Sequence, residues 1–130
     1  ILDLGAGLKP FVKPILQQCN RIILVVEPVY PSDAMGRALL QELETSGIAS
    51  NKIGLALINR VGTSLQVPWR QVESDLGIEL AGIISPAPEQ AHQASQAGSP
   101  LVDSYADSLV SEQIRKLAES LLTHLHPPKG

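Results

Sequence analysis

The chain has 130 residues, the length of one domain, and 44% of them are hydrophobic whereas 18% are charged. Its formal net charge is −3 and its ten Lys and Arg residues are scattered, which argues against a nucleic-acid-binding surface. A single cysteine, Cys19, excludes a disulfide framework and a cysteine-based metal site, and favours the reducing cytoplasm. No apolar run reaches the roughly 18 residues of a transmembrane helix, so we expect no membrane span.

Short apolar runs alternate with helical patterns along the chain. The runs are continuous, as is typical of strands that are covered on both faces. The helices are predicted from apolar residues spaced three and four apart, with Ser or Pro near their starts and Gly after their ends. In chain order we expect a strand over Ile1–Leu4, a short helix within Phe11–Cys19, a strand over Ile22–Val26, a helix from Ser32 to about Ser46, a strand over Ile53–Ile58, a helix over Pro68–Leu76, a strand over Ile78–Ile84, a helix over Pro88–Ala97 and a last helix over about Ser108–Leu125.

This alternation predicts an α/β fold, a doubly wound and mostly parallel sheet with helices on both faces. No linker composition divides the chain, so residues 1–125 form one unit, and 126–130 are a flexible tail. In the helix that begins at Ser32, we expect Met35, Leu39 and Leu43 to share the buried face.

Polar residues and glycines follow the predicted strands at the sheet edge where α/β proteins bind ligands. They are Asp3 with Gly5 and Gly7, Glu27, Asn59 with Arg60, and Ser85 with Pro86. An Asp at such an edge can hold a metal-bound water, and a Gly-rich turn lets backbone N–H groups approach a phosphate. An acid, an amide and an Arg together are typical of a nucleotide site and not of a nucleophile with its base.

Each of these residues also has a plain structural explanation, and both explanations stay open here. Asp3 can cap the glycine turn, and Asn59 can satisfy loop backbone groups. Arg60 is better explained as a surface or stacking residue than as a catalytic finger, and Pro86 shapes a loop with or without a ligand. His124 and His126, two residues apart, indicate a solvated tail and not a metal pair.

Several sequence pieces occur in a familiar order and spacing. They are Ile1-Leu-Asp-Leu-Gly-Ala-Gly7, Ile22–Val26 followed by Glu27 and Pro28, Leu57-Ile-Asn-Arg60, Leu76-Gly77, Gly82-Ile-Ile-Ser-Pro86 and Ala97-Gly-Ser-Pro100. Together they resemble the carboxyl half of the MinD/ParA family of deviant P-loop ATPases. The resemblance covers residues 1–123 and is greatest to the CpaE-like branch, which is associated with bacterial pilus assembly and in which receiver-like, response-regulator domains sometimes precede the ATPase.

The resemblance implies roles for the strand-end residues. Asp3 would be the catalytic residue that orients a magnesium-bound water, and Gly5 and Gly7 would form the switch loop, in which the Gly7 N–H senses the γ-phosphate. Asn59 would contact adenine, with Arg60 and Pro86 beside the base. The intact domain would bind ATP and Mg²⁺ and act as a positioning or pilus-assembly ATPase.

Three departures limit this resemblance. No G-x-x-x-x-G-K motif occurs in the 130 residues, so the loop that grips the β- and γ-phosphates is absent. Ala87 stands where the family usually has Asp, which weakens the assignment of the base site. The last helix carries only Arg115 and Lys116 among acidic and polar residues, so we expect no membrane binding.

From these departures we expect the amino-terminal half of the nucleotide-binding domain to be missing, and the chain alone to bind no nucleotide and to hydrolyse no ATP. The uncovered sheet edge would favour a homo-oligomer, most simply a two-fold dimer. An alternative is a pseudo-ATPase that localises or binds a protein partner. A phospho-acceptor receiver domain is rejected because the third strand ends in Asn59 and no Lys follows the last.

Overall fold

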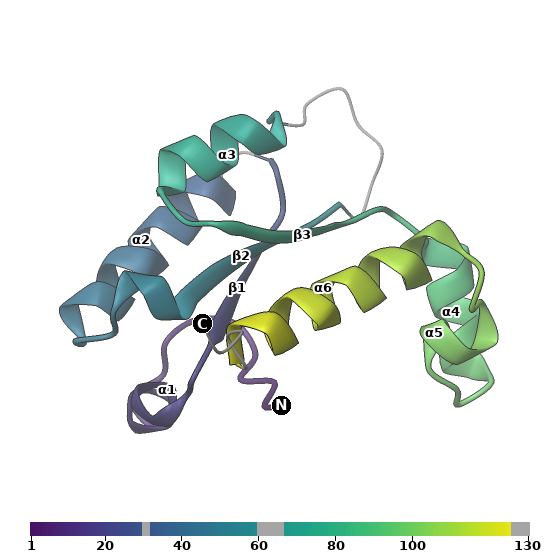
Figure 1. The fold of residues 1–130 in the computed structure, drawn as a ribbon, viewed down its shortest axis with the longest axis horizontal. Helices are drawn as coiled ribbons and strands as arrows, with labels where there is room; N and C mark the ends of the chain where they lie inside the picture. The colour runs from purple at the N-terminus through teal and green to yellow at the C-terminus, as the bar shows by residue number, and fades with distance from the viewer. Residues whose placement is uncertain (30–31, 60–66, 126–130) are drawn as a thin grey trace.

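A computed structural model describes residues 1–29, 32–59 and 67–125 of the chain. Its elements, drawn in Figure 1, are α1 (Lys13–Gln18), β1 (Ile22–Val26), α2 (Ser32–Thr45), the 3₁₀ turn η1 (Ser50–Lys52), β2 (Ile53–Ile58), α3 (Trp69–Leu76), β3 (Leu80–Ile84), α4 (Pro88–Gln96), α5 (Leu101–Ser104) and α6 (Leu109–Leu125). None of the described helices is long and apolar enough to cross a bilayer.

Within the described residues, three parallel strands form a single sheet in the order β1-β2-β3. Ile22 lies opposite Ile53 in the first pair of strands, and Ala56 lies opposite Gly82 in the second. The predictions for β1 and β2 are confirmed to the residue, and β3 begins two residues later than Ile78. The predicted α/β architecture with a parallel sheet is therefore confirmed.

The strand predicted over Ile1–Leu4 is wrong, because these residues are irregular in the structure. A short apolar segment becomes a strand only through ladder hydrogen bonds to a neighbour, and none of the described strands pairs with this one. Ile1 and Leu2 are exposed, whereas Leu4 and Leu8 pack partly buried against the main core. The segment is therefore attached to the molecule through side chains and not through a sheet ladder.

The main hydrophobic core lies between one face of the sheet and the first three helices. Figure 1 shows α2 and α3 on one side of the sheet and α6 on the other. The core consists of alternate residues of the strands together with apolar residues of the helices and their flanks: Val12, Leu16, Ile22, Leu24, Val26, Leu40, Leu43, Ile48, Ile53, Leu55, Leu57, Val67, Val72, Leu76 and Ile78.

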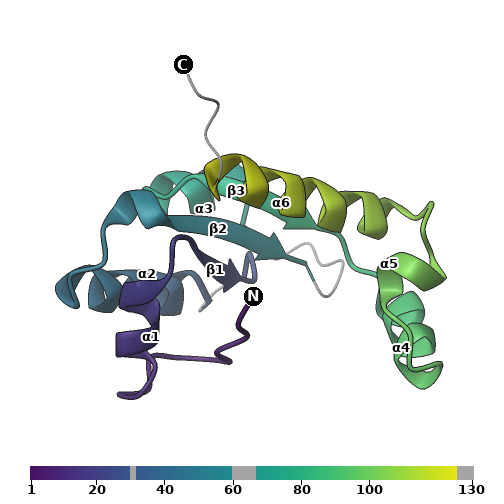
Figure 2. The same ribbon diagram turned by 60° about the horizontal axis from the view of Figure 1, so that its bottom comes forward.

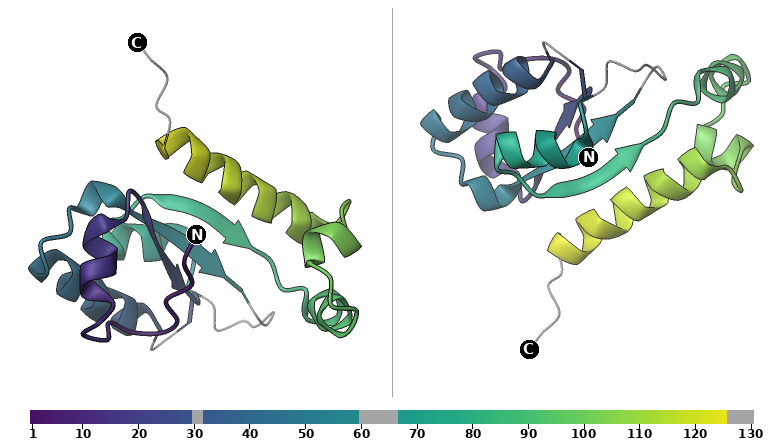
Figure 3. Two further views of the ribbon diagram at one scale, coloured as in Figure 1. Left: turned by 90° about the horizontal axis from the view of Figure 1, so that it is seen from below. Right: turned by 90° about the horizontal axis from the view of Figure 1, so that it is seen from above.

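The second face of the sheet is covered by α6, which runs along β3 (Figure 3). Gly82 permits this close approach, since a Cβ atom added there would lie 3.3 Å from Leu117 of α6. The cover does not extend over β1, where the side chain of Val25 is 56% exposed. One strand of the sheet is thus buried on one face only.

A charged network anchors the last turn of α6. The guanidinium of Arg21 is 7% exposed, donates to the carbonyl of Asn51 at 2.8 Å and pairs with the carboxylate of Glu79 at 3.2 Å. The same carboxylate contacts Nε2 of His124 at 3.1 Å. Gly54 leaves room for the guanidinium, because an added Cβ would lie 2.8 Å from it.

The helices differ from the predictions at three places. In α2, Leu43 is buried and Leu39 partly so, but Met35 is 69% exposed, and Leu40 is buried in its place. The turn η1 and the four-residue helix α5 were not predicted. α5 packs beside α4 at one end of the molecule (Figure 2), and the hydroxyl of Tyr105 donates to Gln93 there. The N-cap side chain of Ser32 and residues 126–130 lie outside the described part of the chain.

Candidate functional site

A hollow of about 270 Å³ lies at the carboxyl ends of the three strands. Its lining comes from β2 and β3, from the residues that follow β1 and β2, and from the start of α3 and the residues before it: Pro28, Leu57, Asn59, Val67, Pro68, Trp69 and Ile83. In open parallel α/β sheets this edge is where ligands bind. The position of the hollow in the fold is therefore that of a ligand site.

Two backbone hydrogen bonds hold the walls of the hollow in place. The N–H of Val67 donates to the carbonyl of Pro28 at 2.8 Å, and the N–H of Asn59 donates to the carbonyl of Ile84 at 2.9 Å. The first ties the residues just before α3 to those just after β1, and the second ties the residue after β2 to the last residue of β3. Asn59 is half-buried, and its N–H hydrogen bond ties its backbone to β3.

The lining is apolar except for two groups. Among the seven residues, only Asn59, with an amide, and Trp69, with an indole, carry side-chain hydrogen-bonding groups, and Trp69 is 41% exposed. The guanidinium of Arg70 lies over the indole, 5.1 Å from its centroid. An apolar wall with one or two placed polar groups is the usual composition of a small-molecule site.

The loop that contains Asp3 folds on itself. Oδ1 of Asp3 accepts a hydrogen bond from the N–H of Gly5 at 2.9 Å, so the carboxylate closes the glycine turn. Gly5 and Gly7 have φ values of +68° and +76°, a region that side-chain-bearing residues avoid. Asp3 thus caps the glycine turn through an observed hydrogen bond. The role of Asp3 toward a metal-bound water stays a prediction.

The predicted site residues do not all come together. Asn59 lines the hollow, whereas Asp3, Gly5, Gly7 and Pro86 do not. Arg60 lies outside the described residues.

Pro86 is exposed in the loop that follows β3. Its neighbour Ser85 is tied to α6, since the Ser85 N–H donates to Oε1 of Gln113 at 2.8 Å and Nε2 of Gln113 donates to the Ser85 hydroxyl at 2.9 Å. Sequence reasoning missed Gln113, and it assigned no ligand role to Trp69. No local pattern indicated Trp69, because its place at the hollow depends on how α3 packs against the rest of the molecule.

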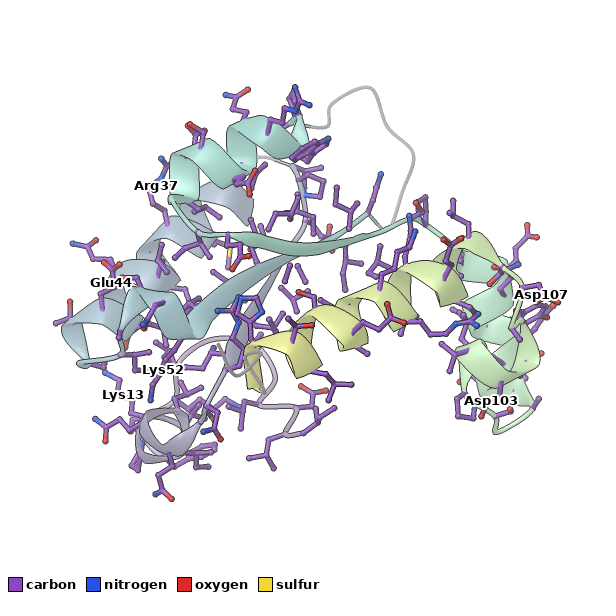
Figure 4. The ribbon with its side chains drawn as sticks, in the orientation of Figure 1. Lys13, Arg37, Glu44, Lys52, Asp103 and Asp107 are labelled. Atoms are coloured by element: carbon purple, nitrogen blue, oxygen red, sulfur yellow. The ribbon has the colours of Figure 1, made fainter. Side chains whose placement is uncertain are left out.

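Charged groups gather elsewhere. A hydrogen bond and the positive charge of Lys116 lower the pKa of Glu112, and Glu112 raises the pKa of Lys116 in turn; the two groups form an exposed pair at 2.6 Å on α6. Lys13 and Lys52 lie at the α1 end of the molecule, and Asp103 lies at the α5 end (Figure 4). Within the described part of the chain, no three His, Cys, Asp or Glu residues are arranged to hold a metal.

No protein-family model matches the chain. Its sequence is 29% identical over 125 residues to an uncharacterised ATP-binding protein of Methanocaldococcus jannaschii, an alignment that covers 94% of this chain and 45% of that protein.

Solved structures give a closer comparison of the fold. The septum site-determining protein MinD of Pyrococcus horikoshii, complexed with Mg-ADP, superposes with a TM-score of 0.75 at 23% identity, covering 90% of this chain and 47% of that one. The MinC:MinD complex of Aquifex aeolicus gives a TM-score of 0.78 at 18% identity, with 95% and 51% covered. A ParA family ATPase of Chlorobium tepidum superposes with a TM-score of 0.76 at 17% identity, and the match covers 90% of this chain and 48% of that one. The chain has the fold of MinD/ParA ATPases, and it spans about half the length of the proteins it matches.

Proposed function

We propose that this chain is the carboxyl-terminal part of the nucleotide-binding domain of a MinD/ParA-type ATPase and that it supplies the base-binding side of the ATP site. The hollow at the strand ends carries this proposal. The side-chain amide of Asn59 can accept a hydrogen bond from the N6 amino group of adenine and donate one to a ring nitrogen. The apolar lining suits the faces of a base.

The phosphates require further residues. The sequence holds no G-x-x-x-x-G-K motif, so the backbone cradle and the lysine for the β- and γ-phosphates are not among these residues. The turn formed by Asp3, Gly5 and Gly7 is proposed to act at the phosphate end of the bound nucleotide. One exposed carboxylate with waters and phosphates is a ligand set that Mg²⁺ accepts, so Asp3 fits a role through a bound water.

The finer assignment concerns the cellular role. We place the parent protein in the CpaE-like branch, as a cytoplasmic positioning or pilus-assembly ATPase of bacteria that works as a homo-oligomer, because of the order of the strand and loop pieces in the sequence. Deletion of its gene would then abolish assembled pili and leave septum placement unchanged. A deletion strain with normal pili and displaced septa or chromosomes would instead favour another branch of the family.

The test of nucleotide binding uses the natural full-length protein. Calorimetry with ATP and Mg²⁺ should show binding that weakens about tenfold in Asn59→Ala, since a lost pair of hydrogen bonds to the base corresponds to about 1.4 kcal/mol. Asp3→Ala should reduce magnesium-dependent hydrolysis more than nucleotide binding. If the wild-type protein binds no ATP, the alternative of a pseudo-ATPase that localises or binds a partner replaces this proposal.

The 130-residue chain alone is expected not to hydrolyse ATP. Phosphoryl transfer depends on positioning and on neutralising phosphate charge, and the phosphate loop that supplies most of both is not in this sequence. Release of phosphate from ATP by the purified chain should equal that of buffer. A magnesium-dependent rate that Asp3→Ala abolishes would contradict this expectation.

A further inference from the structure

The apolar face of α3 continues from the core into the hollow. Trp69, Val72 and Leu76 are spaced three and four apart, so they share one side of the helix. Val72 and Leu76 are 0% and 6% exposed, but Trp69 is 41% exposed. The core therefore covers the last turn of this face, whereas the indole at the first turn is bordered by the hollow.

The hollow has the size of one ring system. Its volume of about 270 Å³ is just below the roughly 300–1,000 Å³ range of sites that enclose whole drug-sized ligands. It thus suits a base better than a complete nucleotide. Pro28, Pro68 and the indole of Trp69 give it flat apolar surfaces.

One side of the indole already has a partner. The Arg70 guanidinium lies over the ring in a cation–π contact, 5.1 Å from its centroid. Since an aromatic ring offers two faces, a second planar group can stack on the other. Asn59 and Trp69 line the same hollow, so one ligand can contact both.

We propose that Trp69 is a specificity-determining residue, whose indole stacks on the purine base while Asn59 contacts the base edge. This inference rests on the proposed function of the site. Stacking on an aromatic side chain favours large ring systems, so the preference for a purine over a pyrimidine nucleotide would come largely from Trp69.

The experiment measures ADP and CDP affinities by calorimetry for the natural full-length protein and its variants. Trp69→Ala is expected to weaken ADP binding roughly 5- to 150-fold and to reduce the ratio of ADP to CDP affinity. Trp69→Phe keeps an aromatic ring and should retain most of the ADP affinity and most of the preference for ADP over CDP. Tripolyphosphate, which has no base, should compete with ADP for the phosphate site with the same inhibition constant in wild type and in Trp69→Ala.

Phe11→Ala is a matched control. Phe11 is an exposed aromatic residue with a cation, Lys9, 6.0 Å from its ring centroid, but it does not line the hollow. Its loss should leave both affinities unchanged. Trp69 is the single tryptophan of the 130-residue chain, so its fluorescence is lost in the Trp69 variants, and far-UV circular dichroism is used to check the fold of each preparation.

The outcomes separate the two proposals. If wild type does not bind ADP, the proposed function fails. If wild type binds ADP and Asn59→Ala weakens it, but folded Trp69→Ala binds ADP and CDP like wild type, the nucleotide site stands and the role of Trp69 is overturned.

Discussion

Gly82 is the residue that allows α6 to approach β3. A Cβ atom built there would lie 3.3 Å from both Cβ and Cδ1 of Leu117, tighter than ordinary van der Waals contact. Gly82→Ala is therefore expected to lower the free energy of unfolding by about 1–3 kcal/mol, the usual cost of overpacking. Urea denaturation followed by circular dichroism measures this change.

A double-mutant cycle with Leu117→Ala identifies the source of that strain. Removing the Leu117 side chain makes room for the new methyl group, so the two changes should be non-additive by about 0.5–3 kcal/mol. If the free energies of unfolding simply add, the strain arises from another neighbour of Gly82.

Some residues of the candidate site can be predicted from the sequence, and others cannot. Asn59 is predictable because it directly follows the continuous apolar run of β2. The approach of Trp69 to Asn59 depends on how α3 packs after the intervening loop, and no local pattern encodes that packing. The turn at Asp3 is predictable from its two glycines, but whether the carboxylate also serves a ligand is not.

The elements were predictable where burial alone defines them. β2 is buried on both faces and β1 on one, and continuous apolar residues mark the bounds of both parallel strands. Ile1–Leu4 has the same composition but lacks a paired neighbour, and strand structure requires one. α5 has four residues, too few for a helical repeat. In α2, Met35 and Leu40 fit an apolar stripe about equally well, and packing against the sheet buries Leu40 alone.

Glu79 joins β1, β3 and α6 through one carboxylate. Glu79→Ala would deprive the buried Arg21 guanidinium of its anionic partner. Since the Glu79 side chain itself is 61% exposed, water can partly replace its carboxylate. We therefore expect the free energy of unfolding to fall by an amount near the lower end of the roughly 1–3 kcal/mol that an unsatisfied buried group costs.

Two controls accompany this measurement by urea denaturation. His124→Ala removes the outer contact only and should destabilise the chain less than Glu79→Ala. Asp75→Asn, on the exposed side of α3, should change little. If the Glu79 and His124 variants lose equal free energy of unfolding, the stabilisation by Glu79 comes mainly from its contact with His124 of α6 and not from its pairing with Arg21.

Helices cover one face of the sheet fully, whereas α6 covers the other face along β3 and leaves Val25 of β1 exposed. Helices α1–α3 enclose the main core on the first of these faces. The outer edge of β1 has no strand partner among the described residues. Unpaired N–H and C=O groups beside an apolar surface favour pairing with another chain.

We therefore expect the 130-residue chain to self-associate, most simply as a two-fold dimer through the β1 edge. Light scattering across a dilution series should show a mass that rises with concentration. Val25→Lys places a charge on the exposed face of β1 and should shift the association to higher concentration. Leu109→Lys, at an equally exposed apolar position on α6, should not. A chain that stays monomeric at millimolar concentration would mean that the β1 edge is protected, and the fold would then be self-sufficient despite its three-stranded sheet.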